Sequence, residues 1–228
     1  MRYFIVGDIH GCSDQLRVLI EHRNLYQGRQ VVFLGDYVDV GTDSRSVIDQ
    51  LIQFRQRYGN SILLEGNHES ALKSFLRTGD FVSYAAIGGL ATLRAYSGKV
   101  FGDVRKGFER AFPIEHRNFL NSLETYLETK QYLFSHAGYS PSAPLDRSRE
   151  SMVLRSHQDL FTKPPTLNKL CVCGHYFQKT LMAYLSDRVI CLDTGCGILD
   201  GPLTAALLPE RALVQVNVDL ELVTTEPR

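Results

Sequence analysis

Short apolar runs recur along the chain, and glycine and polar residues closely follow each of them. The runs are rich in β-branched and aromatic residues, which favours buried strands. They cover residues 2–6, 31–34, 61–64, 132–134 and 170–173. The polar residues that follow include Asp, Asn or His in every case. Ligands bind at the carboxyl ends of strands in open α/β sheets, so five such ends side by side predict a ligand site.

Apolar residues at three- and four-residue spacing separate the first three runs and predict two helices. The first is expected from Ser13, which can cap it, to about Arg23. The second is expected from Asp43 or Ser44 to Gly59. Strands that alternate with helices in this way predict a parallel sheet with right-handed crossovers.

The middle of the chain breaks this alternation. Residues 70–130 are predicted to be mostly helical, and we expect a helical insert that packs beside the site and shapes access to it. The alternative is that the insert only covers sheet surface. Beyond it, hairpins are expected over 181–192 and 203–218, which predicts a second sheet packed against the first, and the tail after Glu221 is expected to fray. Residues 1–228 are interpreted as a single domain.

Composition excludes several classes of protein. Lys+Arg and Asp+Glu both number 25, and this balance argues against a chain that coats nucleic acid. No run of 18 apolar residues predicts a transmembrane helix, and the first residues lack the pattern of a signal peptide, so we expect a cytoplasmic protein. The five cysteines are expected to be reduced and buried rather than paired.

The polar residues at the strand ends form a mixed set of oxygen and nitrogen ligands. Its members are Asp8, His10, Asp36, Asn67, His136 and His175. Such a set suits manganese, iron or zinc, and six ligands are too many for one structural zinc. They suffice for two divalent ions, with Mn²⁺ the first candidate, if one carboxylate bridges them. Two ions roughly 3.5–4 Å apart can clamp a phosphate and lower the pKa of a shared water, and the hydroxide so formed would attack phosphorus in line.

The reaction also needs an acid for the leaving oxygen. His68 directly follows Asn67 and is therefore expected at the rim of the site. Asp39 is the carboxylate best placed to orient His68 and to favour its protonated form. We therefore predict that His68 and Asp39 form a catalytic acid pair.

The strand-end blocks, in their order and spacing, resemble the signature of a known family. They are Gly7-Asp8-x-His10-Gly11, Gly35-Asp36-x-Val38-Asp39, Gly66-Asn67-His68-Glu69, His136-Ala137-Gly138 and Gly174-His175. The family is the phosphoprotein phosphatase (PPP) family of calcineurin-like metallophosphoesterases, in its bacterial type. The resemblance covers about Met1 to Leu208, apart from the middle segment, and Leu192-Asp193-Thr194-Gly195 is similar to a C-terminal part of the family.

The resemblance implies an α/β fold with a central β-sandwich flanked by helices and a site at the strand ends. It also implies how the ligands divide between two metals, with Asp36 as the bridge. Asp8, His10 and Asp36 would hold the first metal. Asp36, Asn67, His136 and His175 would hold the second.

One position departs from the family pattern. The family has Arg after the second Asp of Gly-Asp-x-Val-Asp, where this chain has Val40. That Arg grips phosphate with its bidentate fork. The resemblance places a second phosphate-binding Arg at Arg155, and Arg45 is the other candidate, whereas the loop residues Arg147 and Arg149 are weaker ones. We therefore hypothesise altered phosphate affinity or a non-protein substrate.

The leading interpretation is a binuclear metal-dependent phosphomonoesterase, similar to serine/threonine protein phosphatases. It would act on phosphoserine or phosphothreonine peptides or on a small phosphorylated metabolite. A symmetrical bis(5'-nucleosyl)-tetraphosphatase is the enzyme alternative, although that family tends to have Ala at the position of Asp39. A non-catalytic phosphate-binding module is the alternative from another class. No nucleic-acid or membrane partner is expected, and the sequence leaves the oligomeric state open.

Overall fold

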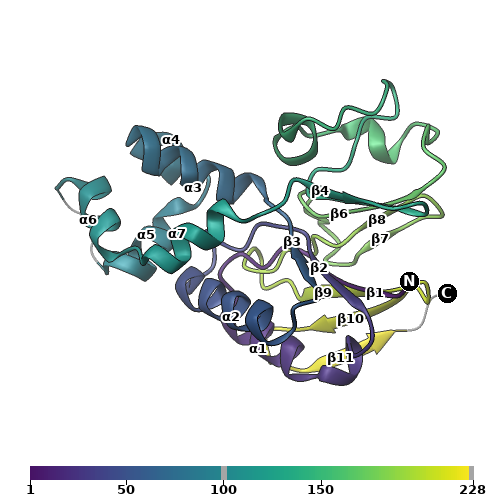
Figure 1. The fold of residues 1–228 in the computed structure, drawn as a ribbon, viewed down its shortest axis with the longest axis horizontal. Helices are drawn as coiled ribbons and strands as arrows, with labels where there is room; N and C mark the ends of the chain where they lie inside the picture. The colour runs from purple at the N-terminus through teal and green to yellow at the C-terminus, as the bar shows by residue number, and fades with distance from the viewer. Residues whose placement is uncertain (99–101, 226–228) are drawn as a thin grey trace.

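The computed structural model describes residues 1–98 and 102–225, which form two mixed β-sheets with helices on the outside (Figure 1). The first sheet has the order β11-β10-β9-β1-β2-β3. Its strands are β1 (Tyr3–Val6), β2 (Gln30–Phe33), β3 (Ser61–Leu63), β9 (Leu203–Leu208), β10 (Ala212–Val216) and β11 (Leu222–Thr225). Strands β1, β2 and β3 run parallel, as predicted, whereas β9, β10 and β11 are antiparallel to their neighbours.

The C-terminal tail differs from the sequence prediction. Residues after Glu221 were expected to fray, but β11 pairs with β10 from Val216↔Leu222 to Leu213↔Thr225. The backbone N–H groups of β11 find ladder partners there, and Leu222 packs against the core below. Because β11 is a mostly exposed edge strand with one residue packed against the core, its sequence resembles that of a fraying tail.

The second sheet has the order β4-β5-β6-β8-β7. Its strands are β4 (Tyr126–Glu128), β5 (Tyr132–Ser135), β6 (Leu170–Cys173), β7 (Tyr184–Leu185) and β8 (Val189–Cys191). The predicted hairpin over 181–192 is present as β7 and β8, shortened at both ends. Strand β4 was not predicted, because it lies within the 70–130 stretch that we expected to be helical.

The two sheets pack face to face, and their shared core includes Ile5 and Leu34 from one side and Phe134 and Val172 from the other. The five strand ends that carry the polar blocks are therefore not neighbours in one sheet. Those of β1, β2 and β3 belong to the first sheet, and those of β5 and β6 belong to the second. The site forms where the two sets of strand ends meet.

Helices α1 (Ser13–Glu21) and α2 (Ser44–Arg57) cover the outer face of the first sheet (Figure 1). Asp43 caps α2 as predicted, accepting a hydrogen bond from the backbone N–H of Ser46 at 3.0 Å. Ser13 does not cap α1: it is the first residue of the helix, which follows Cys12 and ends at Glu21, two residues before the predicted end.

Five further helices lie to one side of the sheets (Figure 1). They are α3 (Asn67–Thr78), α4 (Phe81–Ala86), α5 (Gly89–Ser97), α6 (Val104–Ala111) and α7 (Ile114–Asn121). We call residues 67–121 the helical segment. Aromatic side chains hold its helices together, with Phe75 stacked on Tyr84 and Tyr96 against Phe108. Within the described residues 67–98 and 102–121, helices thus occupy most of the range predicted to be helical, which β4 follows.

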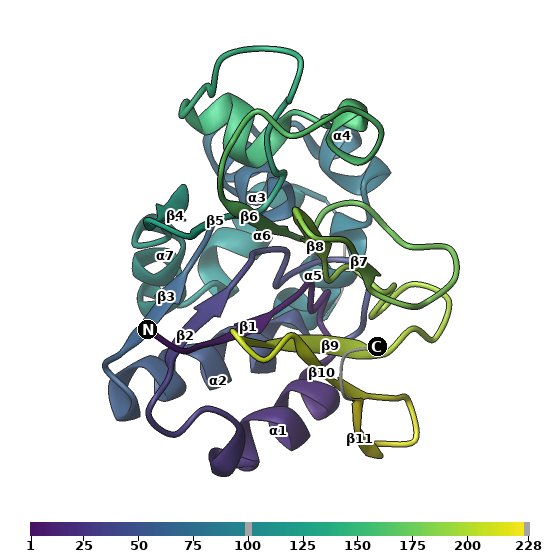
Figure 2. The same cartoon turned by 90° about the vertical axis from the view of Figure 1, so that its right-hand side faces the viewer.

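The outer face of the second sheet is covered by residues 136–169, drawn in green at the top of Figure 2. This stretch contains only the short helical turns Glu150–Leu154 and Gln158–Phe161, and a similar turn, Arg23–Leu25, follows α1. Across residues 1–98 and 102–225, no helix is long and apolar enough to cross a membrane.

Candidate active site

The loops that follow the strands hold their site residues in an unusual backbone conformation. His10, Asp36, Asp39, Val40 and His175 all have positive φ angles, between 44° and 70°. Non-glycine residues adopt this left-handed region at a cost, and such residues concentrate at functional sites. At these five positions the left-handed backbone turns the chain from a strand end into a site loop.

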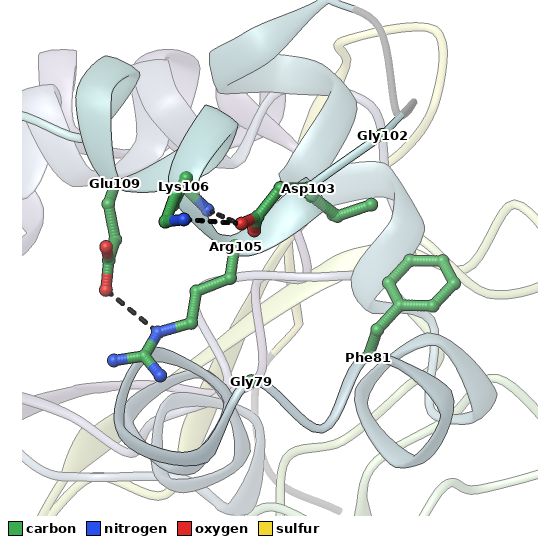
Figure 3. Close-up of a pocket in the computed structure, with 8 residues that line it drawn as sticks. Gly79, Phe81, Gly102, Asp103, Arg105, Lys106 and Glu109 are labelled. Atoms are coloured by element: carbon green, nitrogen blue, oxygen red, sulfur yellow. Dashed lines mark hydrogen bonds and ion pairs between the residues drawn. The ribbon is translucent and has the colours of Figure 1, made fainter.

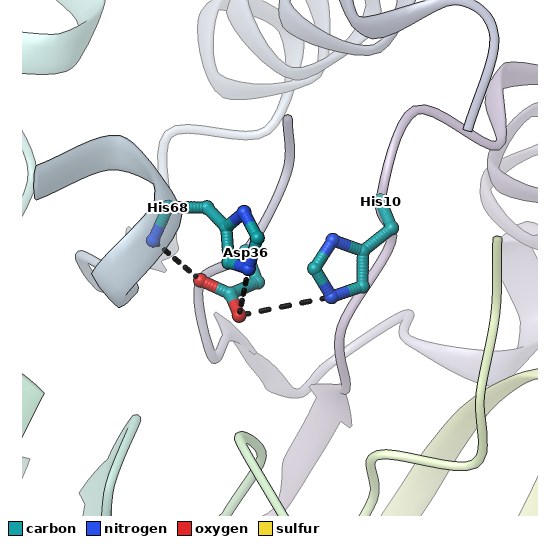
Figure 4. A group of neighbouring side chains, drawn as sticks. All are labelled: His10, Asp36 and His68. Carbon is teal, nitrogen blue, oxygen red and sulfur yellow. Dashed lines mark hydrogen bonds and ion pairs between the residues drawn. The ribbon is translucent and has the colours of Figure 1, made fainter. Parts of the chain in front are cut away.

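Asp36 lies at the centre of the site (Figure 4). Its Oδ2 atom is 3.3 Å from His136 Nε2, 3.7 Å from His10 Nε2 and 3.9 Å from His68 Nε2. Two groups of three potential ligand atoms share this carboxylate, each with all atoms within 4.8 Å of one another: His10, Asp36 and His68, and Asp8, Asp36 and His136. A carboxylate common to two ligand groups has the geometry of a bridge between two cations.

Asn67, the first residue of α3, joins the remaining histidines. Its Oδ1 atom is 2.9 Å from His136 Nε2 and 2.8 Å from His175 Nδ1. The other ring nitrogen of His136 lies 3.0 Å from the backbone carbonyl of Leu34, which fixes the ring orientation. The structure therefore brings together all six side chains of the ligand set predicted from the sequence.

Asp8 is buried, and only one of its carboxylate oxygens has a partner. Oδ2 accepts a hydrogen bond from the backbone N–H of His175 at 2.9 Å, whereas Oδ1 is buried without one. Burial, reinforced by the nearby Asp193 and Asp36 carboxylates, raises the pKa of Asp8 well above its ordinary value. A bound cation would stabilise the ionised form of a carboxylate that is buried among other carboxylates.

The charges of the imidazoles are also suited to cations. Burial lowers the pKa of both His10 and His175 to about 4, so both rings are neutral near pH 7 and present lone pairs. Burial alone raises the pKa of Asp36, but His136 and His68 outweigh it and hold that pKa well below its usual range. The neutral imidazoles of His10 and His175, the amide oxygen of Asn67 and the ionised carboxylate of Asp36 fit divalent cations of borderline hardness. These residues therefore fit a divalent metal centre.

His68 and Asp39 form a close pair beside this centre. His68 Nδ1 is 2.9 Å from Asp39 Oδ2, and Asp39 is fully buried. Burial alone lowers the pKa of His68, but the Asp36 and Asp39 carboxylates outweigh it and raise the pKa to about 9. A protonated imidazole with Nε2 facing Asp36 can donate a proton to a leaving oxygen.

Glu69 holds the loop after β2, a role for which the sequence analysis made no prediction. Its buried carboxylate accepts hydrogen bonds from the backbone N–H groups of Asp36, Tyr37, Val38 and Gly66 at 2.8 to 3.2 Å. The spacing offered a signal, because Glu69 is the third residue of α3, where a carboxylate reaches back to the start of its helix.

Asp193 is the second residue whose importance the sequence reasoning missed. It follows β8 and is almost completely buried, and burial raises its pKa to about 6. Its Oδ1 atom accepts a hydrogen bond from the backbone N–H of Gly195 at 3.2 Å. It adds negative charge next to Asp8 and so strengthens the site's demand for cations.

The predicted phosphate-binding arginines have other partners. Arg155 is more than half exposed, and its Nη2 lies 2.6 Å from Glu150 Oε1. The guanidinium of Arg45 stands over the Tyr96 ring, 5.8 Å from its centroid. The weaker candidates Arg149 and Arg147 form bidentate pairs with Glu65 and Glu128, respectively. Both loop arginines are thus held by carboxylates of their own.

A hollow of about 650 Å³ lies on the helical segment (Figure 3), and none of the candidate ligand residues lines it. Phe81, Asp103 and Glu109 are among its lining residues. Its two basic side chains are neutralised, since Lys106 pairs with Asp103 and Arg105 pairs with Glu109. This hollow therefore lacks free positive charge for a phosphate, and the buried ligand cluster remains the chemical centre.

Comparison with known proteins identifies the class. Residues 1–205 match the family model for calcineurin-like phosphoesterases, and the chain belongs to that family. The predicted family and α/β fold are thereby confirmed. The chain is an enzyme that hydrolyses phosphoric esters, and its family implies divalent metal ions.

One curated relative is bis(5'-nucleosyl)-tetraphosphatase PrpE [asymmetrical] from Oceanobacillus iheyensis. It is 26% identical to this chain over 95% of the chain and 92% of the relative. Among solved structures, a candidate diadenosine tetraphosphatase aligns with a TM-score of 0.60 and 23% identity, covering 100% of this chain and 94% of the other. A serine/threonine phosphatase from Saccharomyces cerevisiae aligns with a TM-score of 0.55 and 16% identity, covering 100% and 80%. At these identities the structural matches establish the shared fold.

Proposed function

We propose that the ligand cluster holds two divalent ions, Mn²⁺ first among the candidates with iron or zinc as others, bridged by Asp36. Asp8 and His10 would complete the first site, and Asn67, His136 and His175 the second. The observation that carries the proposal is the Asp36 carboxylate, which both groups of potential ligands share. The assignment of the other residues to the two sites follows the family resemblance, because the groups themselves join His10 with His68 and Asp8 with His136. Bound there, the ions would neutralise substrate phosphate and supply an activated water.

The acid pair completes the proposed mechanism. His68, charged through its contacts with Asp36 and Asp39, would protonate the oxygen that leaves phosphorus. Asp39 would keep the proton on Nδ1 and orient Nε2 towards the site. Glu69 would fix the backbone on which Asp36 is carried.

For the substrate we propose a dinucleoside polyphosphate such as diadenosine tetraphosphate. The relative from Oceanobacillus iheyensis, which matches nearly the whole chain, supports this choice. Val40 supports it as well, because an internal phosphate of a polyphosphate carries about one negative charge and a terminal monoester phosphate up to two. A site without the Arg fork loses less affinity for the less charged group.

The second candidate is the phosphomonoesterase that the motifs predict. The fold shared with a serine/threonine phosphatase and the presence of Asp39 favour it. Either substrate class would be handled by the same metal ligands and acid pair. A location in the cytoplasm and a single domain over residues 1–228 remain part of this proposal.

The test is hydrolysis after chelation and reloading with Mn²⁺. Wild type, Asp36→Asn and His68→Asn would be compared on diadenosine tetraphosphate, a phosphothreonine peptide and p-nitrophenyl phosphate. The exposed residues Asp219 and His22 supply matched controls as Asp219→Asn and His22→Asn. We expect metal-dependent turnover that falls at least about 100-fold in both site variants and stays intact in the controls.

Product analysis then separates the substrates. Asymmetrical cleavage of diadenosine tetraphosphate gives ATP and AMP, whereas symmetrical cleavage gives ADP alone. Faster turnover of the phosphopeptide would replace the proposed substrate with the second candidate. Absence of both metal binding and turnover would reject the binuclear centre.

A further inference from the structure

The helical segment reaches the acid pair through two hydroxyl groups. The Tyr84 hydroxyl, from α4, and the Thr92 hydroxyl, from α5, each donate a hydrogen bond to Asp39 Oδ1 at 2.6 Å. The other oxygen, Oδ2, faces His68 Nδ1 at 2.9 Å. The Asp39 carboxylate is thus divided, with one oxygen bound by the helical segment and the other bound by the proposed acid.

The proton directions in this network are determined by its partners. The backbone N–H of Asp39 donates to Thr92 Oγ1 at 2.9 Å and to Ser44 Oγ at 3.1 Å. Since Thr92 has one proton and gives it to Asp39, the Ser44 hydroxyl donates to Thr92 across 2.9 Å. Burial, followed by the charge of Asp39, raises the pKa of Tyr84 well above its ordinary value, so Tyr84 stays a donor.

The same helices also hold the backbone beside Asp39. The N–H of Val40 donates to the carbonyl oxygen of Gly88, in the turn between α4 and α5, at 3.3 Å. A Cβ at Gly88 would lie 3.0 Å from Val40 Cγ2. Asp39 and Val40 have φ angles of 70° and 66°, which few non-glycine residues adopt without support. Contacts from α4 and α5 therefore fix both the side chain and the backbone of this loop.

We propose that Tyr84 and Thr92 are positioning residues that act through Asp39 on His68, the proposed proton donor to the leaving group. This inference rests on the proposed role of His68 as the acid. Their two hydrogen bonds hold the Asp39 carboxylate in one rotamer, and so keep Oδ2 bonded to His68 Nδ1 and Nε2 turned towards the leaving oxygen. The helical segment, which distinguishes this chain from the plain strand-end pattern, thereby governs leaving-group protonation and does more than cover the sheets.

The test compares leaving groups. An aryl phosphate with a poor leaving group, phenyl phosphate, needs protonation far more than p-nitrophenyl phosphate does. We expect Tyr84→Phe and Thr92→Val to lower kcat for phenyl phosphate about tenfold or more, and that for p-nitrophenyl phosphate about threefold or less. Thr92→Ser, which keeps the hydroxyl, should restore most of the loss. His68→Asn provides the reference for complete loss of the acid.

Tyr96→Phe is the matched control. Tyr96 is another buried tyrosine of the helical segment, and its hydroxyl bonds His116 Nδ1 at 2.7 Å and not Asp39. This variant should leave the ratio of the two rates unchanged. Equal losses on both esters in Tyr84→Phe, or the same loss in Tyr96→Phe, would show a general effect on folding and overturn the proposal.

A second readout does not depend on turnover. In the protein loaded with diamagnetic Zn²⁺, nitrogen-15 NMR reports the His68 Nδ1–H group directly. We expect its resonance to shift and its exchange with water to accelerate in Tyr84→Phe and Thr92→Val, but not in Tyr96→Phe. An unchanged resonance in the first two variants would overturn the positioning role. If His68→Asn lowered kcat equally for phenyl phosphate and p-nitrophenyl phosphate, the acid role on which the proposal rests would be rejected instead.

Discussion

The backbone of Gly174 lies against the carboxylate of Asp8, so closely that a Cβ at Gly174 would stand 1.9 Å from Asp8 Oδ1. This oxygen is also the buried one without a hydrogen-bond partner. Oδ2 is held by the backbone N–H of His175, so the carboxylate cannot turn away. The glycine after β6 thus makes room for a carboxylate that comes from β1 in the other sheet.

We expect Gly174→Ala to abolish metal binding at the Asp8 side of the site. The added methyl group must displace Asp8, and turnover should fall at least about 100-fold with it. Metal content per chain, measured by atomic emission after dialysis, checks the first effect. Gly107→Ala is the control, because no atom lies within 4 Å of a Cβ there and alanine favours the helix. A Gly174→Ala protein with two metals per chain would contradict the prediction.

Glu69→Gln tests the support under Asp36. The Glu69 carboxylate accepts hydrogen bonds from backbone N–H groups through both oxygens. A glutamine would place an NH₂ donor against some of these N–H groups, which would then lose their acceptor. The free energy of unfolding should fall by about 2–4 kcal/mol, measured by urea denaturation of the metal-free protein. Glu115→Gln, an exposed change on α7, should alter it by less than about 0.5 kcal/mol. Equal stability of both variants would mean that the loop does not depend on Glu69.

Val40→Arg tests the missing phosphate contact. If the fork can reach the substrate, KM for p-nitrophenyl phosphate should fall about tenfold, because the monoester carries the higher charge. KM for diadenosine tetraphosphate should change less. Val40→Met has similar length without charge and serves as the control. A Val40→Arg variant with no advantage over Val40→Met would show that this position does not limit catalysis.

The His68 pKa of about 9 has a consequence for metal-free protein. The Asp36 and Asp39 carboxylates raise this pKa above the ordinary value near 6.5, so their ion pairs with His68 stabilise the fold fully below pH 6.5. That contribution, at most about 3 kcal/mol, should disappear as the pH rises through 9. Unfolding of wild type and Asp39→Asn between pH 6 and 10 measures it. The difference between the two proteins should shrink with rising pH, and a constant difference would contradict the assignment.

The strand-end chemistry was predictable because its signals are local. An apolar run followed by Gly and Asp, as at 31–36, specifies a buried strand, a turn and a ligand within six residues. The caps were partly predictable for the same reason: Asp43 caps α2, whereas Ser13 already lies inside α1 and its hydroxyl donates to the Asp43 carboxylate. The division of the strand ends between two sheets depends on long-range pairing, which no local pattern records.

The residues that contact the acid pair could not be predicted from the sequence for a related reason. Tyr84 and Thr92 read as ordinary helical residues, and only packing of α4 and α5 brings them to Asp39. Asp193 follows a strand, as the predicted ligands do, but its block had no metal role attached to it. Val40 was visible as a departure, yet its contact with Gly88 appears only in three dimensions.

The contacts of α4 and α5 with Asp39 also bear on how the enzyme responds to heat. Asp39 accepts hydrogen bonds from short helices of 6 and 9 residues, whereas the proposed metal ligands other than Asn67, which begins α3, lie in loops that follow strands of the two sheets. Short helices are the elements that open first as temperature rises. The chemical step would then fail at a temperature at which the sheets and their ions are still intact. We therefore expect the heat tolerance of catalysis to depend more on the helical segment than on the sheets.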